Sequence, residues 1–190
     1  MRVIAGQFKG RRLKTPSWHG VRPTSDKLRE TLFNILAPRV EGARVLDGFA
    51  GTGAIGIEAL SRGAGHVTFI ERDRRASALI EMNLALCGVK QGYTIEYGDV
   101  ASALRRTRRD AACDLVLLDP PYDIDPETVT QVLEVAAGCV TADGLLVLER
   151  ASRRECVVPD ALNRVRDVTS GDSTLTFFSR VSRARPGFVR

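Results

Sequence analysis

From Arg44 onward, short apolar segments alternate with segments of helical periodicity, and this alternation constrains the fold more than any other feature. It predicts strands at residues 45–46, 67–70, 93–97, 115–118 and 145–148, with helices through residues 55–60, 76–84, 100–106 and 127–137. The run Leu115-Val116-Leu117-Leu118 is apolar at every position, as in a central parallel strand that is covered on both faces. A strand–helix series of this kind predicts an α/β protein with a doubly wound, mostly parallel sheet.

Both ends of the chain depart from this alternation. Segments 164–169 and 174–181 flank Gly171-Asp172, which predicts an antiparallel hairpin that completes a seven-stranded sheet. Before the first strand, residues 24–37 place their apolar side chains on one helical face, and Pro38 ends that helix. A parallel sheet that closes with an antiparallel hairpin fits the methyltransferase variant of the Rossmann fold better than the dehydrogenase variant.

Basic residues are concentrated towards the ends of the chain, whose net charge is +5. Residues 1–22 are basic and β-prone, and we interpret them as a short arm in front of a single domain of residues 23–190. Such clusters indicate a polyanionic partner, although a solvated surface is the alternative for any one of them. The three clusters are Arg2, Lys9, Arg11, Arg12 and Lys14; Arg105, Arg106, Arg108 and Arg109; and Arg180, Arg183, Arg185 and Arg190.

Composition argues against several other classes of protein. The cysteines, Cys87, Cys113, Cys139 and Cys156, are far apart and include no C-x-x-C pair, so we expect reduced thiols, no disulfide framework and no metal site. No apolar segment approaches the ~20 residues of a membrane span, and the first residues do not form a signal peptide. We therefore expect a cytoplasmic monomer that uses no membrane, and surface or loop positions for His19 and His66.

A glycine-rich loop follows the first predicted strand. Residues 51–56 have the spacing G-x-G-x-x-G, which alone also suits a dinucleotide. Asp47 ends the strand, and a carboxylate there would repel the pyrophosphate of NAD. S-adenosylmethionine has no phosphate and carries an amino group and a sulfonium, so an acid is favourable, and glycines allow close approach. The sequence thus predicts S-adenosylmethionine as the cofactor, bound by Asp47, Phe49, Ala50, Gly51, Thr52 and Gly53.

Two further acids lie at the ends of successive strands, where open α/β sheets bind ligands. Glu71 is placed to accept hydrogen bonds from the ribose hydroxyls, and the alternative is a surface ion pair with Arg72 or Arg74. Asp99 is placed to meet the adenine amino group, and the alternative is a helix N-cap. The predicted cofactor site also includes Arg72, Val100 and Asp119.

The tetrapeptide Asp119-Pro120-Pro121-Tyr122 follows the most hydrophobic strand and is the predicted catalytic segment. Proline has no N–H and a fixed φ, so its carbonyl is an acceptor with a fixed direction. Hydrogen bonds from an exocyclic amine to the Asp119 side chain and the Pro120 carbonyl would aim the nitrogen at the methyl group, with no covalent intermediate. Tyr122 can stack on the base. The alternative is a proline-rich strand exit with a tyrosine in the core.

Five segments together carry a family resemblance: residues 2–11, 22–36, 46–53, 119–122 and 171–178. They resemble the bacterial 16S ribosomal RNA guanine-N2 methyltransferases over nearly the whole chain. The glycine-rich loop and the tetrapeptide are shared with many amino-methyltransferases, whereas residues 22–36 are the specific part. The resemblance implies a Rossmann-like class I methyltransferase fold with a short basic N-terminal β-arm. It also implies that the substrate is a guanine of 16S rRNA in the small ribosomal subunit, methylated on N2.

By the same resemblance, RNA contacts are expected on the arm and the first helix. The alternative for residues 22–24 is a loop and N-cap that open the helix, and both interpretations can hold together. Three rival functions stay open. A DNA adenine-N6 methyltransferase shares the loop and tetrapeptide, but the chain has no obvious target-recognition domain. A protein-glutamine methyltransferase would more often have Asn at position 119. A non-catalytic RNA-binding or ribosome assembly factor would not need the intact acids. The expected RNA-binding residues are Arg2, Lys9, Arg11, Arg12, Lys14, Arg22, Thr24 and Asn34.

Overall fold

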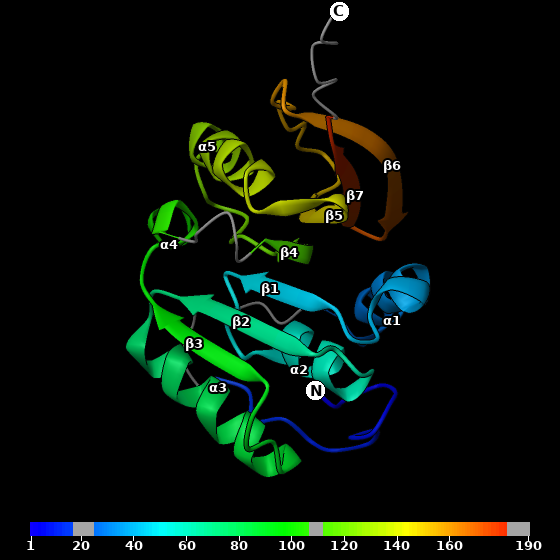
Figure 1. Cartoon of the computed structure of the whole chain (residues 1–190), viewed down its shortest axis with the longest axis vertical. Helices are drawn as coiled ribbons and strands as arrows, with labels where there is room; N and C mark the ends of the chain where they lie inside the picture. Colours follow the sequence, from blue (N-terminus) through cyan, green and yellow to red (C-terminus); the bar gives the residue numbers. More distant parts are fainter. Residues whose placement is uncertain (17–24, 107–111, 182–190) are drawn as a thin grey trace, which may run out of the picture.

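Seven strands form one sheet in the order β3-β2-β1-β4-β5-β7-β6 in the computed structural model, which describes residues 1–16, 25–106 and 112–181 (Figure 1). The antiparallel pairings of β7 with β5 and with β6 confirm the predicted C-terminal hairpin, and the other neighbours are parallel. The doubly wound, mostly parallel sheet is therefore confirmed. The strands are β1 (Arg44–Gly48), β2 (His66–Glu71), β3 (Tyr93–Tyr97), β4 (Cys113–Leu118), β5 (Val140–Ala151), β6 (Leu162–Ser170) and β7 (Ser173–Arg180).

Helices pack on both faces of this sheet. One face carries α1 (Asp26–Leu36), α2 (Ala54–Ser61) and α3 (Arg74–Cys87), with the 3-10 turn η1 (Ala37–Arg39) after α1. The other carries α4 (Val100–Arg106) and α5 (Pro126–Ala137). The first helix begins two residues later than the sequence pattern predicts, because Ser25 is its N-cap and its Oγ accepts a hydrogen bond from the backbone N–H of Leu28 at 3.1 Å.

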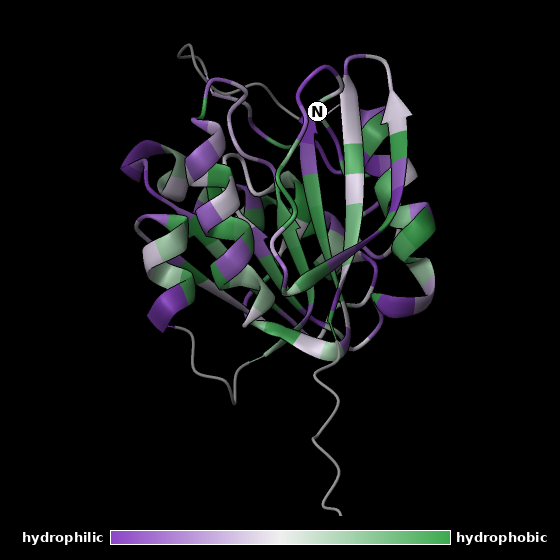
Figure 2. Ribbon diagram, turned by 90° about the horizontal axis from the view of Figure 1, so that it is seen from above, coloured by the Kyte–Doolittle hydropathy of each residue, from purple (hydrophilic) through white to green (hydrophobic). Residues whose placement is uncertain are grey.

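Side chains of the central strands alternate between two hydrophobic clusters. In β4, Leu115 and Leu117 belong to the cluster on the α1–α3 side, whereas Val116 and Leu118 belong to the cluster on the α4–α5 side. Figure 2 shows the apolar residues gathered in the strands between the two groups of helices. Because β4 is buried on both faces, it lacks the polar alternation of a half-exposed strand.

The N-terminal arm packs onto the helices and belongs to the same core. A bridge between Arg2 and Arg12 closes a hairpin, whose Val3 and Leu13 are buried. Glu58 of α2 is fully buried. Its carboxylate accepts hydrogen bonds from the backbone N–H groups of Ile4 at 2.8 Å and Ala5 at 3.0 Å. The described part of the arm is therefore integral to the domain, and the predicted boundary between arm and domain lies outside the described residues.

Glu58 also joins the arm to α1 through the buried side chain of Arg29. Nε of Arg29 lies 3.8 Å from Oε2 of Glu58, and Nη2 donates a hydrogen bond to the Arg2 carbonyl at 2.5 Å. Burial lowers the pKa of Arg29, and the charges of Asp26 and Glu58 oppose that shift. Since a buried charge is tolerated only when it is paired, the arm, α1 and α2 depend on one another.

Helix α2 approaches β2 closely because Gly56 has no side chain. A Cβ atom at Gly56 would lie 2.2 Å from Cε1 of the Phe69 ring and 2.9 Å from Cγ1 of Val67. Both neighbours belong to buried β2 residues, so neither can move without disturbing the core.

We expect Gly56→Ala to destabilise the fold by about 2 kcal/mol or more, because overpacking a full core displaces its neighbours. Gly138→Ala is the matched control, since Gly138 has a helical φ of −74° and its Cβ would meet only the Val135 carbonyl at 3.3 Å. Urea unfolding of the two variants measures the difference. Equal midpoints would contradict the proposed close contact.

Candidate functional site

The glycine-rich loop connects β1 to α2 at the carboxyl edge of the sheet. Gly51 and Gly53 adopt positive φ values of 55° and 75°, and Phe49 adopts 61°. Positive φ is costly for a residue with a side chain, so the loop conformation at Phe49 requires support from its surroundings. Gly53 is the N-cap of α2 and offers no side-chain acceptor. The first N–H groups of the helix must therefore find acceptors elsewhere.

Asp47 of β1 supplies one such acceptor. Its side chain is 1% exposed, and Oδ2 accepts a hydrogen bond from the backbone N–H of Gly56 at 2.8 Å. Burial raises the pKa of Asp47 well above its usual range; the Gly56 hydrogen bond opposes this shift, and the charges of Asp119 and Glu71 add to it. Asp47 therefore lies behind the loop and stabilises its conformation. Its predicted contact with the cofactor stays a prediction.

Glu71 connects the end of β2 to the same loop. Its Oε2 accepts a hydrogen bond from Gly51 N–H and its Oε1 from Asp73 N–H, both at 2.8 Å. Among the ion pairs of the described residues, none joins Glu71 to Arg72 or Arg74, so that alternative is not observed. Carboxylate oxygens accept more than one hydrogen bond, and a ribose contact is compatible with this geometry.

Asp99 lies at the end of β3 and is exposed. Its Oδ1 accepts a hydrogen bond from the backbone N–H of Ser102 at 2.9 Å, which makes it a cap for α4, as the alternative interpretation held. This hydrogen bond lowers the pKa of Asp99, and the charges of Arg105 and Arg72 contribute. This hydrogen bond uses only Oδ1, and Asp99 is exposed, so it can cap α4 and contact adenine at the same time.

The tetrapeptide lies beside the glycine-rich loop. Asp119 donates its backbone N–H to the carbonyl of Gly48 at 3.3 Å, and its side chain is close enough to Asp47 to raise the pKa of that carboxyl. Pro120 is buried and Pro121 is exposed. The structure thus brings the acids at the ends of β1, β2 and β4 to one edge, as the strand pattern predicts.

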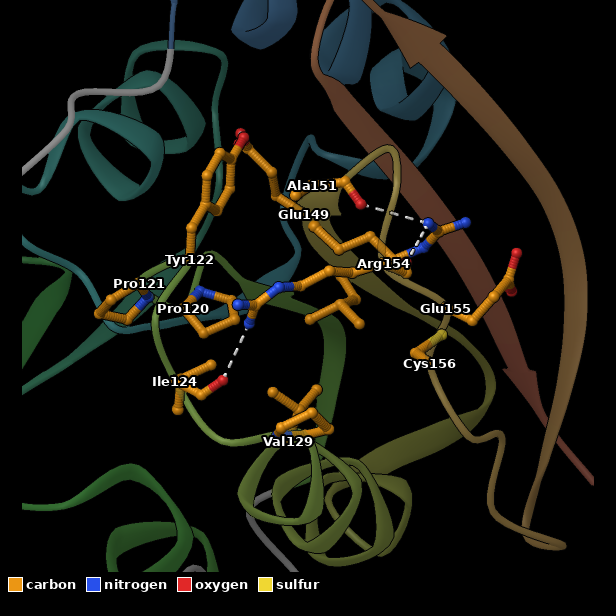
Figure 3. Close-up of a pocket in the computed structure, with 13 residues that line it drawn as sticks. Pro120, Pro121, Tyr122, Ile124, Val129, Glu149, Ala151, Arg154, Glu155 and Cys156 are labelled. Atoms are coloured by element: carbon orange, nitrogen blue, oxygen red, sulfur yellow. Dashed lines mark hydrogen bonds between the residues drawn. The ribbon is translucent and has the colours of Figure 1, made fainter.

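Tyr122 is fixed through its hydroxyl group. The oxygen lies 2.5 Å from Oγ of Ser173 in β7. It also donates a hydrogen bond to Oε1 of Glu149 in β5 at 3.3 Å, and Figure 3 shows the ring directed at that side chain. Both partners are buried, whereas Tyr122 itself is half-buried. The sequence predicted a stacking ring but not these partners, which lie in the C-terminal half of the sheet.

A small pocket lies on the far side of the tetrapeptide from the glycine-rich loop. It has a volume of about 50 Å³, and its walls come from residues 120–129, the end of β5 and residues 154–156. Arg154 donates a hydrogen bond to the Ile124 carbonyl at 3.2 Å across it (Figure 3).

The predicted RNA-binding residues that the structure describes are exposed. Arg2, Lys9, Arg11, Arg12 and Lys14 lie on the arm, and Asn34 lies on α1. Arg22 and Thr24 fall outside the described residues, as do Arg108, Arg109 and the last arginines of the chain. The role of each of these residues in RNA binding stays a prediction.

Asn83 of α3 connects the arm to the glycine-rich loop. It is 0% exposed, and the sequence pattern indicates only that it lies on a helical face. Its Oδ1 accepts a hydrogen bond from Lys14 N–H at 2.8 Å, and its Nδ2 donates to the carbonyls of Lys14 at 3.1 Å and Thr52 at 2.9 Å. A polar residue on an otherwise apolar helical face was the signal in the sequence that could have revealed this role.

No group of three or more His, Cys, Asp or Glu side chains suited to a metal ion occurs in the described parts of the chain. None of the four cysteines forms a disulfide. No helix in residues 1–16, 25–106 or 112–181 is long and apolar enough to cross a membrane.

Comparison with known proteins shows one family along most of the chain. Residues 1–179 match the family model described as "Conserved hypothetical protein 95". The chain is 32% identical over 173 residues to "Ribosomal RNA small subunit methyltransferase D" of Haemophilus influenzae, covering 90% of this chain and 89% of that protein. It is 43% identical over 122 residues to the protein of the same name from Escherichia coli K12, covering 64% and 60%. A solved structure described as the putative methyltransferase yhhF from Escherichia coli superposes with a TM-score of 0.82 at 32% identity, covering 95% and 97%.

We expect Asn83→Ala to weaken binding of S-adenosylmethionine about tenfold, because it removes the hydrogen bond to the Thr52 carbonyl and loosens the loop. Ser61→Ala is the matched control. Ser61 also binds the arm, accepting from Phe8 N–H at 2.9 Å and donating to the Ala5 carbonyl at 2.5 Å, but it does not touch the loop. Titration calorimetry with parallel thermal melts separates affinity from stability. Equal affinities in the two variants would contradict the role of Asn83.

The raised pKa of Asp47 gives a prediction for stability against pH. The folded chain holds this proton more tightly than the unfolded chain, so wild-type stability should fall relative to Asp47→Asn as pH rises from about 4 towards the raised pKa. Asparagine keeps an oxygen acceptor for Gly56 N–H and cannot ionise. Thermal midpoints of the two proteins between about pH 4 and 8 measure the effect. A difference that stays constant over this range would argue against a buried, titrating Asp47.

Proposed function

The chain belongs to the family described as "Conserved hypothetical protein 95", and from this premise we propose that it methylates the exocyclic N2 amine of a guanine in the 16S RNA of the small ribosomal subunit. Relatives that match nearly the whole chain are named as small-subunit ribosomal RNA methyltransferases, which supports the class of reaction and the substrate. The choice of guanine N2 rests on the resemblance of residues 22–36 and 119–122 to that family.

The acids at the carboxyl edge fit a positively charged cofactor. S-adenosylmethionine, when bound, supplies the methyl group from its sulfonium. Glu71 and Asp119 are close enough to Asp47 to raise its pKa, so these two acids concentrate negative charge at this edge even where Asp47 holds its proton. Such a site favours a cation and disfavours the pyrophosphate of a dinucleotide. Glu71 and Asp99 are the residues we expect to bind ribose and adenine.

The observation that carries the proposal is the position of Asp119 beside the glycine-rich loop, with its N–H on the Gly48 carbonyl. An exocyclic amine that donates N–H hydrogen bonds to the Asp119 carboxylate and the Pro120 carbonyl has its nitrogen directed at the cofactor side of the tetrapeptide. Orientation and fixed acceptors then lower the barrier, and the proton leaves after the nitrogen has gained its methyl group. The Tyr122 hydroxyl, fixed by Ser173, keeps the end of the tetrapeptide in place.

The substrate is tested by incubating the protein and labelled S-adenosylmethionine separately with small ribosomal subunits, naked 16S RNA and DNA, and then mapping the modified base. We expect label on N2 of a guanine in the ribosomal RNA. Label on DNA adenine alone would favour the DNA adenine-N6 alternative. Absence of label with retained RNA binding would favour a non-catalytic assembly factor.

We expect Asp119→Ala to reduce methyl transfer by about 10²-fold or more while cofactor binding persists, since it removes an acceptor that acts on the reacting amine. Asp123→Ala is the matched control, because Asp123 is an exposed acid just beyond the tetrapeptide. Single-turnover transfer and calorimetric cofactor binding are measured for both variants. Transfer by the Asp119 variant at the control rate would rule out this mechanism.

A further inference from the structure

Tyr97, the last residue of β3, projects beyond the hydrophobic core. Tyr93 and Ile95 of the same strand pack against the cluster on the α3 side, and strand alternation places Tyr97 on that face. Its side chain is 54% exposed, and the guanidinium of Arg74, at the start of α3, lies 4.8 Å from the ring centroid. The ring therefore contributes little to the core, while Arg74 restricts its orientation.

Arginines flank the end of β3 on both faces of the sheet. Arg74 begins α3 on one face, and Arg105 and Arg106 lie in the last turn of α4 on the other (Figure 1). Nη2 of Arg106 lies 3.9 Å from Oε2 of Glu96, the residue next to Tyr97. Among the ion pairs of the described residues, none includes Arg74 or Arg105. We name Arg74, Tyr97, Arg105 and Arg106 the β3 rim.

The β3 rim lies on the same edge of the sheet as the tetrapeptide. In the strand order, β3 is separated from β4 by β2 and β1. At about 4.8 Å between neighbouring strands, the rim lies ~14 Å from the end of β4. This separation is within reach of the nucleotides next to a base held at Asp119. The predicted cofactor residues Glu71 and Asp47 lie between the two places.

We propose that the β3 rim binds the single-stranded RNA beside the target guanine, with a base stacked on Tyr97 and phosphates on the three arginines. This proposal rests on the proposed function and extends its RNA contacts beyond the N-terminal arm. Aromatic stacking combined with cationic contacts to the backbone is how proteins bind single strands. An acidic protein surface would be attracted by the arginines alone and would not require an exposed, oriented ring.

The test compares variants in filter binding to naked 16S RNA and to small subunits over a salt series. Tyr97→Ala should weaken RNA binding about tenfold with an unchanged salt slope, because stacking is not ionic. Tyr97→Phe should bind as wild type does, because stacking does not use the hydroxyl. Arg105→Ala should weaken binding and reduce the slope by about 0.7, the effect of one phosphate contact on a single strand.

Lys90→Ala is the matched control. Lys90 is an exposed cation that precedes the other end of β3, so its loss changes the net charge by the same amount as loss of Arg105. We expect it to bind RNA almost as wild type does. Affinity for S-adenosylmethionine is measured in every variant and should not change.

Four outcomes overturn the proposal. If Tyr97→Ala and Arg105→Ala bind RNA like Lys90→Ala while the wild type methylates ribosomal RNA, the β3 rim does not bind RNA and the proposed function stands. If affinity for the cofactor falls with affinity for RNA, the rim belongs to the cofactor site. If only binding to assembled subunits falls, the partner is a ribosomal protein. A wild type that neither binds nor methylates RNA contradicts both proposals.

Discussion

The close contact between α2 and β2 at Gly56 is the constraint on which the rest of the site depends. Because Gly56 has no side chain, Phe69 packs directly against the helix backbone. Gly56 also donates its backbone N–H to Asp47, so the first turn of α2 is fixed both to β2 and to the end of β1. Once the start of α2 is fixed, the loop has only a short distance to span between the end of β1 and the helix. Positive φ values at Gly51 and Gly53 are the result.

Helix α2 also determines where the N-terminal arm lies. Glu58 and Ser61, both buried, bind the backbone of the arm, and Arg29 joins Glu58 from α1. Removing one partner from such a buried network costs about 3–5 kcal/mol, so arm and helix form one unit. Asn83 then extends this unit to the cofactor loop. A segment that the sequence presents as an appendage is therefore connected to the predicted cofactor site by buried hydrogen bonds.

The sequence was sufficient to predict the sheet and the placement of the acids, because strand periodicity and strand ends are local features. Asp47, Glu71 and Asp119 follow from the rule that parallel strands end at one edge. The partners of these residues were not predictable, since Tyr122 meets Ser173, and Asn83 meets Lys14, across 51 and 69 residues. The capping role of Asp99 was open because one carboxylate suits a helix start and a ligand equally well. Only the fold decides which atoms meet.

The distribution of charge suggests how an acidic site can serve an RNA substrate. Asp47 is buried and Glu71 half-buried at the carboxyl edge, whereas Arg72 and Arg105 are exposed and close enough to Asp99 to lower its pKa. Phosphates are repelled by the acids and attracted by the exposed cations, so the RNA backbone is expected to stay at the periphery. A nucleobase carries no charge, and its amine donates hydrogen bonds to carboxylates. The same electrostatic arrangement that favours the sulfonium therefore admits the base and excludes the backbone, which makes extrusion of the base from its strand a condition of reaction.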